Sequence, residues 1–181
     1  LNTYQIEENF FEAYVKGGFD TELAQLPFSG NVGVRVIDRE LTSTGNQLVD
    51  GVPSANVFER SDTEWLPSAV GKLELPGDQV VRLGAARVIS FPNTADLNNG
   101  FQVFRNTAGG TGGSPDLDPI LATQFDLSYE KYFGEGGYVS VGLFYKDIET
   151  FIVERTTEEP FADIGLLTVV RRVNGEEAEV Q

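Results

Sequence analysis

The chain has 181 residues, with 13 basic and 28 acidic side chains, a net charge of −15 at pH 7, and no Cys, His or Met. The lack of Cys and His excludes thiol nucleophiles, disulfides, imidazole bases and zinc sites built on those ligands. The negative charge opposes a nucleic-acid partner, which needs Lys and Arg against its phosphates. Because the chain starts at Leu1 and lacks Met, we expect residues 1–181 to be a partial domain, incomplete at both ends.

Six segments alternate apolar and polar residues, a pattern that predicts β-strands. In chain order they cover residues 9–19, 30–36, 65–75, 79–89, 124–130 and 138–145. One face of the last segment carries Val139, Val141, Leu143 and Tyr145. Weaker candidates at residues 166–173 and 177–181 bring the expected antiparallel meander to about seven or eight strands.

The predicted connections alternate in length along the chain. Tight turns are expected at residues 75–78, 134–137 and 174–175, of which Asn174-Gly175 is a two-residue hairpin signal. Between them we expect a moderate link at 20–29 and long loops at 38–64, 90–121 and 154–165. This alternation places short turns at one end of the sheet and long loops at the other, as in an outer-membrane barrel. The alternative is a soluble, acidic β-sandwich that binds a ligand, in which the apolar face is the core.

Six stretches, in order along the chain, resemble the barrel of TonB-dependent outer-membrane receptors. They are Gly30-Asn31-Val32-Gly33-Val34-Arg35, Trp65-Leu66-Pro67-Ser68, Val81 to Pro92, Gly113-Ser114-Pro115-Asp116-Leu117-Asp118-Pro119, Leu143-Phe144-Tyr145-Lys146-Asp147-Ile148, and Val173-Asn174-Gly175 with the residues up to Val180. Two residues depart from the family pattern, because Phe91 replaces an Arg and Ser114 replaces an Asn. We interpret the motif residues as structural.

The resemblance implies an all-β fold, an up-and-down meander that forms part of a transmembrane barrel wall and is an open curved sheet as a fragment. It also implies a place in the outer membrane of a Gram-negative bacterium and active uptake of a ferric siderophore, a corrinoid or an oligosaccharide. The partners would be outer-membrane lipid and a small-molecule or oligosaccharide ligand at the extracellular loops. TonB would act only through a plug that this chain does not contain. No cofactor, metal or catalytic residue is expected.

Ligand contacts are expected from the three longest loops, at residues 40–62, 91–118 and 155–164. Phe101, Phe104 and Arg105 are the candidates, since aromatic and guanidinium groups dominate binding surfaces. The glycine-rich run 109–113 is expected to be a flexible loop, because it lacks the Lys-Ser/Thr of a phosphate-binding loop.

The pair Asp116 and Asp118 has three possible roles: a calcium site, a glycosidase pair or an architectural element. Calcium needs about six to eight oxygen ligands, more than two carboxylates supply, and a glycosidase pair must flank a bond inside a cleft. The favoured reading is architectural: Pro115 and Pro119 stiffen the chain as it enters a strand.

The charged and aromatic residues of the predicted strands also have expected positions. Four cations should face the barrel interior, because a cation facing lipid is destabilising. These are Arg35, Arg82, Arg87 and Lys146, with Asp126 and Glu130 as partner carboxylates. An aromatic girdle is expected around the turn at 134–137, from Tyr129, Tyr132, Phe133 and Tyr138.

Overall fold

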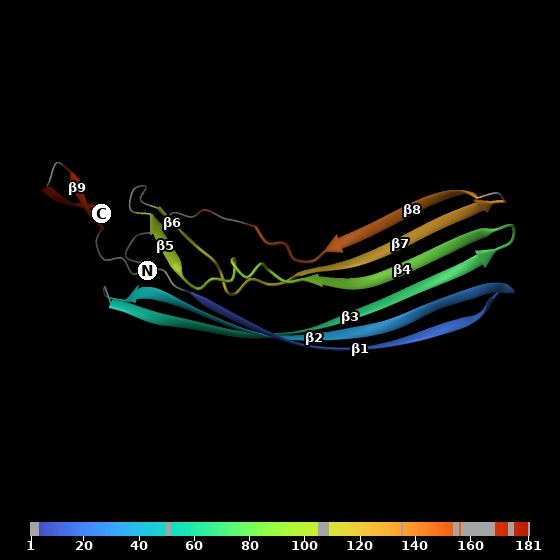
Figure 1. Cartoon of the computed structure of the whole chain (residues 1–181), viewed down its shortest axis with the longest axis horizontal. Coiled ribbons are helices and arrows are strands. Elements are labelled where there is room, and N and C mark those ends of the chain that lie inside the picture. Colours follow the sequence, from blue (N-terminus) through green and yellow to red (C-terminus); the bar gives the residue numbers. More distant parts are fainter. Residues whose placement is uncertain are drawn as a thin grey trace.

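The computed structural model describes residues 4–49, 52–104, 109–134, 136–153, 156, 169–173 and 176–180. Six strands form one antiparallel sheet in the order β1-β2-β3-β4-β7-β8 (Figure 1). They are β1 (Gln5–Leu23), β2 (Leu26–Val49), β3 (Val52–Leu75), β4 (Gln79–Ser90), β7 (Ile120–Phe133) and β8 (Gly137–Ile148). Each strand of this sheet pairs with the strands that come directly before and after it in this order, which is also their order along the chain. The predicted up-and-down meander is therefore confirmed.

Three tight turns lie at one end of this sheet, at the right of Figure 1. Residues with positive φ make each reversal: Ala24 and Gln25 between β1 and β2, Gly77 and Asp78 between β3 and β4, and Gly136 between β7 and β8. The second and third turns are where the sequence predicts them. The moderate link expected at 20–29 is wrong, because β1 continues to Leu23 and β2 resumes at Leu26.

The long loop expected at 38–64, which included the ligand-loop candidate 40–62, is also wrong. Strands β2 and β3 stay paired over these residues, in a register that runs from Phe28↔Leu73 to Val49↔Val52. The side chains of these residues still alternate between the two faces of the sheet. The buried Ile37 and Leu41 lie on the face opposite to that of the apolar residues nearer the tight turns. This long hairpin carries the sheet well beyond the ends of β4, β7 and β8 (Figure 1).

One face of the sheet, which we call the outer face, carries rows of apolar side chains set by the strand register. Leu83, Leu127 and Leu143 lie side by side on β4, β7 and β8. The next row includes Phe125 and Tyr145, whose ring centroids lie 6.5 Å apart. On β1, β2 and β3 the same face carries Val15↔Val34 and Val34↔Pro67.

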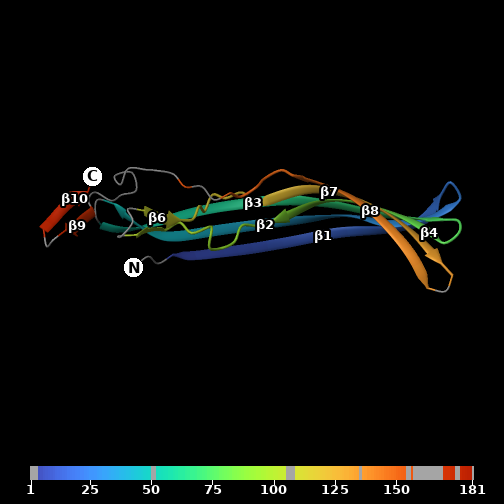
Figure 2. The same cartoon turned by 90° about the horizontal axis from the view of Figure 1, so that it is seen from above.

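The outer face has no protein cover among the described residues. Val139, Val141, Leu143 and Tyr145 are 54%, 59%, 67% and 62% exposed, and the sheet is a single curved layer in both views (Figures 1 and 2). A sandwich requires a second sheet about 10 Å away over this face. The β-sandwich alternative is therefore wrong, and the open curved antiparallel sheet is confirmed.

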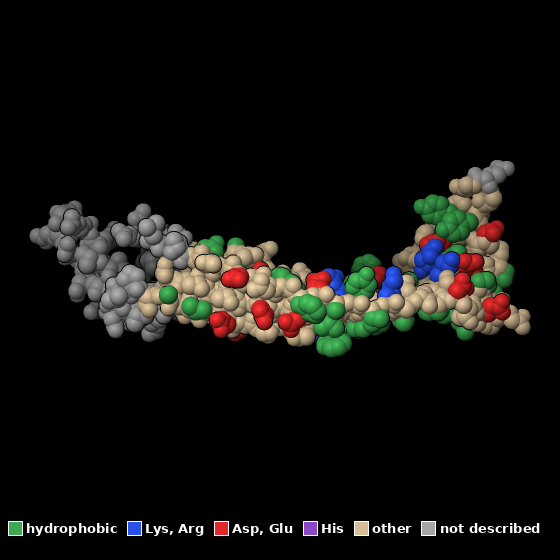
Figure 3. Space-filling view, turned by 60° about the horizontal axis from the view of Figure 1, so that its bottom comes forward, with side chains coloured by type: hydrophobic (Ala, Val, Ile, Leu, Met, Phe, Trp, Pro, Cys, Tyr) green, Lys and Arg blue, Asp and Glu red, His purple; other side chains and the backbone are tan. Residues whose placement is uncertain are grey.

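The apolar part of the outer face ends at Phe11 and Trp65, and we call the part between this level and the tight turns the apolar band. Beyond Trp65 the outer face becomes polar, because the Thr63 hydroxyl donates to Asp38 at 2.6 Å and Glu40 and Glu59 follow. From Trp65 to the turn, β3 has the length of about 9–11 residues with which a tilted strand crosses a bilayer. Figure 3 shows acidic side chains on both halves of the surface, apolar ones prominent near its middle, and Lys and Arg beside acidic side chains at its right end.

Aromatic rings flank the tight turn between β7 and β8, but the register divides the predicted girdle between the two faces. Tyr129 and Phe133 lie on the outer face, as a girdle requires. The prediction is wrong for Tyr132 and Tyr138, which lie on the opposite face with ring centroids 6.0 Å apart, where the Tyr132 hydroxyl donates to Glu130. Near the other turns, the Phe19 ring lies over Gly30 and the Phe28 ring over Gly71. The rings occupy space that side chains at these glycines would fill, which stabilises the strand pairs.

Four short strands form two separate hairpins. Strands β5 (Phe101–Phe104) and β6 (Gly109–Gly112) pair within the connection between β4 and β7, so the glycine-rich run expected to be a flexible loop contains a strand. Strands β9 (Val169–Val173) and β10 (Glu176–Val180) pair with each other and not with the main sheet. The turn residues Asn174 and Gly175 lie outside the described residues. Over the described ranges, no helix is long and apolar enough to cross a membrane.

Leu143 and Phe144 are consecutive residues of β8 on opposite faces, which gives a matched test of the apolar band. We expect Leu143→Arg to lower the free energy of unfolding of the complete barrel in liposomes by about 2–4 kcal/mol, because it places a cation against lipid. The control Phe144→Arg lies on the inner face opposite Asp126 and should have a much smaller effect. Equal effects of the two substitutions would contradict this assignment of faces.

Candidate functional site

Beyond the apolar band, the inner face of β2 and β3 is covered by the connection that leaves β4. Ile37, Leu41 and Leu66 point to this face and are buried. Leu97 of the connection is 0% exposed. Buried apolar side chains thus lie among charged ones on the inner face, at the level where the outer face has become acidic. The outer face changes from apolar to polar along the wall, and the inner face beyond the band holds both kinds of side chain.

The first described part of the connection, residues 91–100, is hydrogen-bonded to the inner wall. The buried Ser43 hydroxyl donates to the Leu97 carbonyl at 2.8 Å and accepts from the Asn99 backbone N–H at 3.2 Å. The Asn56 side-chain amide donates to the Asn99 side-chain oxygen at 3.2 Å. A Cβ at Gly45 would collide with the Asn99 backbone, so a glycine is needed for this close approach.

Phe91 fixes the start of the same stretch. Its ring packs edge-on against Phe10 of β1, with centroids 5.2 Å apart, and the guanidinium carbon of Arg39 lies 4.7 Å from its ring centroid. Arg39 has no exposed surface, a setting in which a cation–π contact is strong. The Phe that replaces the family's Arg therefore supplies the ring under a buried guanidinium.

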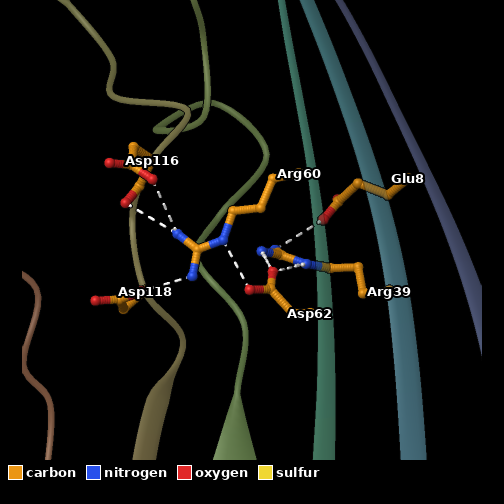
Figure 4. A network of polar contacts seen from close by, with 6 residues as sticks. All are labelled: Glu8, Arg39, Arg60, Asp62, Asp116 and Asp118. Atoms are coloured by element: carbon orange, nitrogen blue, oxygen red, sulfur yellow. Dashed lines mark hydrogen bonds and ion pairs between the residues drawn. The ribbon is translucent and has the colours of Figure 1, made fainter.

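A network of charged residues joins β1, β2 and β3 to the second described part of the connection, residues 113–119 (Figure 4). Arg39 donates to Asp62 at 2.5 and 3.2 Å and to Glu8 at 3.4 Å. Arg60 donates to the other oxygen of Asp62 at 2.7 Å. Asp62 thus links the two arginines. We call these six residues, which include Asp116 and Asp118, the inner-wall network.

The three nitrogens of the Arg60 guanidinium reach three different carboxylates. Nε binds Asp62, Nη1 binds Asp116 at 3.2 Å, and Nη2 binds Asp118 at 2.6 Å. The hydrogen bond to Asp118 raises the pKa of Arg60 above its ordinary value, against partial desolvation, and Asp62 raises it further. Arg60 stays charged at any physiological pH, so it remains a permanent anchor for the two carboxylates.

The network contains two guanidinium groups and four carboxylates, an excess of negative charge. Arg39 is fully buried and Arg60 is 20% exposed, whereas Asp116 and Asp118 are 76% and 67% exposed. A solute on the open side of the network would meet carboxylates first.

The architectural reading of Asp116 and Asp118 agrees with these contacts. Both carboxylates bind one guanidinium, and the following Pro119 is buried where the chain enters β7. Over the described ranges, no group of three or more acidic residues has the arrangement to hold a metal ion. The pair ties a loop to the wall.

Most sequence-predicted ligand contacts are not placed at this network. Phe101 and Phe104 lie on β5, opposite Gly112 and Gly109 of β6, and their role stays a prediction. Arg105 and nearly all of 155–164 lie outside the described residues. Sequence reasoning missed Arg39, Arg60 and Asp62, because the segment that holds them was expected to be a loop.

The strand cations have mixed outcomes. Arg82 is bound to Glu130 on the inner face at 3.0 Å, as predicted, and Arg35 pairs with Glu12 of β1. Lys146 lies on the inner face opposite Gln124, and Asp126 lies opposite Gly84. The prediction for Arg87 is wrong: the register places it on the outer face, where it binds Glu149 at 3.2 Å. It lies at the rim of the apolar band, where the outer face becomes polar.

Gly45 gives a test of the close contact between the wall and residues 91–100. We expect Gly45→Ala to weaken this contact by about 1–3 kcal/mol, because the added methyl group overpacks the interface. The readout is faster hydrogen exchange of the backbone amides of residues 97–100 in the complete protein. Gly17→Ala is the matched control, since a Cβ there would meet nothing within 4 Å. Unchanged exchange in the Gly45 variant would show that the contact is absent.

Arg60 gives an independent test of the second contact. We expect Arg60→Gln to weaken the attachment of residues 113–119 by about 1–2 kcal/mol, a value discounted for the exposure of its outer carboxylates. Arg60→Lys should restore only part of it, because an ammonium lacks the planar three-nitrogen fork. Arg35→Gln is the control, since it removes an inner-face arginine whose ion pair, over the part of the chain that the structure describes, is with Glu12. Protease cleavage within 113–119 that is equal in all three variants would argue against the role of Arg60.

A comparison with protein families gives one match that agrees with this architecture. The family described as TonB dependent receptor-like, beta-barrel matches residues 3–181. A search of curated proteins found no match. The family match spans nearly the whole chain, and the single antiparallel sheet with an uncovered apolar outer face is what a barrel wall requires. The chain belongs to the TonB-dependent receptor β-barrel family, whose members are transporters of the Gram-negative outer membrane and not enzymes.

Proposed function

We propose that this chain forms wall and surface-loop portions of a receptor that actively takes up a scarce nutrient. The candidates are a ferric siderophore, a corrinoid and an oligosaccharide, and the energy arrives from TonB through a plug outside this chain. The observation that carries the proposal is the connection docked on the inner face beyond the apolar band. It supplies polar groups on the inner side of the wall, beyond the membrane, where an entering solute passes.

The charges of the described inner face favour one kind of nutrient among these candidates. Each arginine there, at positions 35, 39, 60 and 82, already pairs with a carboxylate. The exposed side of the inner-wall network consists of Asp116 and Asp118. At the inner-wall network, an anionic chelate would have to approach these carboxylates or break charge-assisted hydrogen bonds, which are about twice as strong as neutral ones. An uncharged oligosaccharide or a chelate without net negative charge avoids both penalties.

The hairpin β5–β6 is the proposed ligand-contacting element. It extends from the docked residues 91–100 and 113–119 at the end of the sheet away from the tight turns (Figure 1). Phe101, Phe104 and Arg105 would contact the solute there, because aromatic rings stack on sugar or chelate surfaces and a guanidinium donates several hydrogen bonds. The docked flanking segments hold the backbone of β5 beside the wall.

Growth of a strain that lacks the full-length gene tests the proposed function. We expect slower growth on one limiting nutrient from a panel of ferric chelates of different charge, cobalamin and glycans, and restoration by the gene on a plasmid. The sensitive nutrient should be neutral or cationic. A defect confined to an anionic chelate would contradict the charge argument, and equal growth on the whole panel would contradict the uptake function.

A further inference from the structure

The connection between β4 and β7 has two described parts that contact the wall, residues 91–100 and 113–119, and we call them the docked segments. They lie on the inner face of β2 and β3, and their own backbones meet, because the Ser114 N–H donates to the Asp96 carbonyl at 2.7 Å. A Cβ at Gly113 would collide with Asp96 and Asn98. The two segments are therefore packed on each other as well as on the wall.

We propose that the docked segments are a permanent lining of the inner wall, held in place throughout transport, and not a gate that opens and closes with each solute. Arg60 is a positioning residue for this lining. The inference rests on the proposed function for what is transported, and on the contacts alone for the docking itself.

The docked segments are buried against the wall, unlike a loop that opens readily. Loops that open readily have few buried contacts and are drawn from the least stable parts of a fold. Leu97, in contrast, is fully buried, and Ser43 beneath it is buried and makes both of its hydrogen bonds to the backbone of the docked segment. Undocking would expose Leu97 to water and would break those hydrogen bonds.

The contacts that hold the two ends of the connection to the wall are linked to each other. Phe91 is held by Arg39 at the start of the connection, and Asp116 and Asp118 are held by Arg60 near its end. Arg39 and Arg60 share Asp62, so each attachment positions the partner of the other. When one attachment breaks, the others keep the segment close to its site, and the high effective concentration favours rebinding.

Glycines lie on the two sides of the contact. Gly45 of the wall and Gly113 of the second docked segment both lie where a side chain would strike the backbone of residues 96–99. These glycines allow close backbone contact only when the segment lies in the position seen here. In a loop that moved between two positions, the glycines would stabilise only one of them.

The test is a reversible cross-link between wall and lining in the complete receptor. The double variant Asn56→Cys with Asn99→Cys places thiols at side chains that contact each other, in a chain with no other Cys. A short bifunctional thiol reagent that a reductant cleaves joins them in cells, and uptake of the nutrient found in the growth panel is measured before and after reduction. Asp38→Cys with Thr63→Cys is the control, since it joins two already paired strands on the outer face.

We expect efficient cross-linking and an uptake rate within about twofold of the control pair. Loss of uptake on cross-linking, with recovery after reduction, would overturn the proposal, because the segment would then have to leave the wall. A failure to cross-link Asn56 to Asn99 while the control pair reacts would also overturn it. If the unmodified receptor takes up no nutrient, the proposed function fails, and slow exchange of the amides of 97–100 still tests the docking.

Adding Arg60→Gln to the cross-linkable pair tests the positioning role. We expect the yield of cross-link to fall and the nutrient concentration for half-maximal uptake to rise, with the maximal rate nearly unchanged. A receptor that is merely misfolded would lose maximal rate through lower abundance in the membrane. An unchanged half-maximal concentration would show that Arg60 does not position the lining.

Discussion

The alternation of side chains along paired strands is the constraint on which the rest of this structure depends. A strand that crosses hydrocarbon must pair all of its backbone N–H and C=O groups, and pairing fixes a register. The register in turn decides which side chains share a face, since successive residues point to opposite sides. One slip of β3 against β2 would bring Leu66 to the outer face and Trp65 to the inner one. The apolar outer face and the ion pairs of the inner face both depend on this register.

The same alternation produces two environments along one hairpin. Toward the tight turns, the outer face is apolar and the inner face carries ion pairs such as Arg82 with Glu130. Beyond Trp65 the outer face is acidic, and Leu41 on the inner face is buried, as is Leu97 of the connection. The hairpin β2–β3 is thus a membrane wall at one end and part of a water-exposed domain with a small core at the other. The change costs no backbone hydrogen bond, because the ladder continues unchanged.

The small core explains why the charged residues are arranged as they are. A fully buried guanidinium is stable only when its charge is compensated, since an unpaired buried charge is strongly destabilising. Arg39 is compensated by Asp62, Glu8 and the ring of Phe91. Arg60 is nearer the surface and uses its fork to join three carboxylates. The buried arginine stabilises the wall and the more exposed one ties the connection to it.

The sequence was sufficient for the strands of the apolar band and for two of the tight turns. The outer face of those strands has no protein cover among the described residues, so its apolar residues appear as a plain period of two, as at Val139, Val141 and Leu143. It was insufficient beyond Trp65, where long strands with Ser, Thr, Asn and Glu on their outer face read as a loop. The turn at Ala24 and Gln25 was missed because neither residue is a usual signal for positive φ.

The candidate site was partly predictable. The prolines around Asp116 and Asp118 indicated an architectural role, and the structure adds the partner, Arg60. That partner lies more than fifty residues away in the sequence, and no local pattern connects the two. Arg87 was misplaced because the inner-face expectation for cations applies only within hydrocarbon. At the rim of the apolar band an outward guanidinium meets water and Glu149.

The outer face of β3 changes from apolar to polar at Trp65, and spin labels placed singly at residues 57 to 73 in the complete receptor in a bilayer test this change most directly. Labels at the odd positions from Trp65 to Leu73 should collide with oxygen dissolved in lipid. Labels at Val57, Glu59, Ser61 and Thr63 should instead collide with a water-soluble relaxing agent. The even positions around Arg60 and Asp62 should be shielded from both. Lipid exposure that continued beyond Trp65, or free water access at Arg60 and Asp62, would contradict the account.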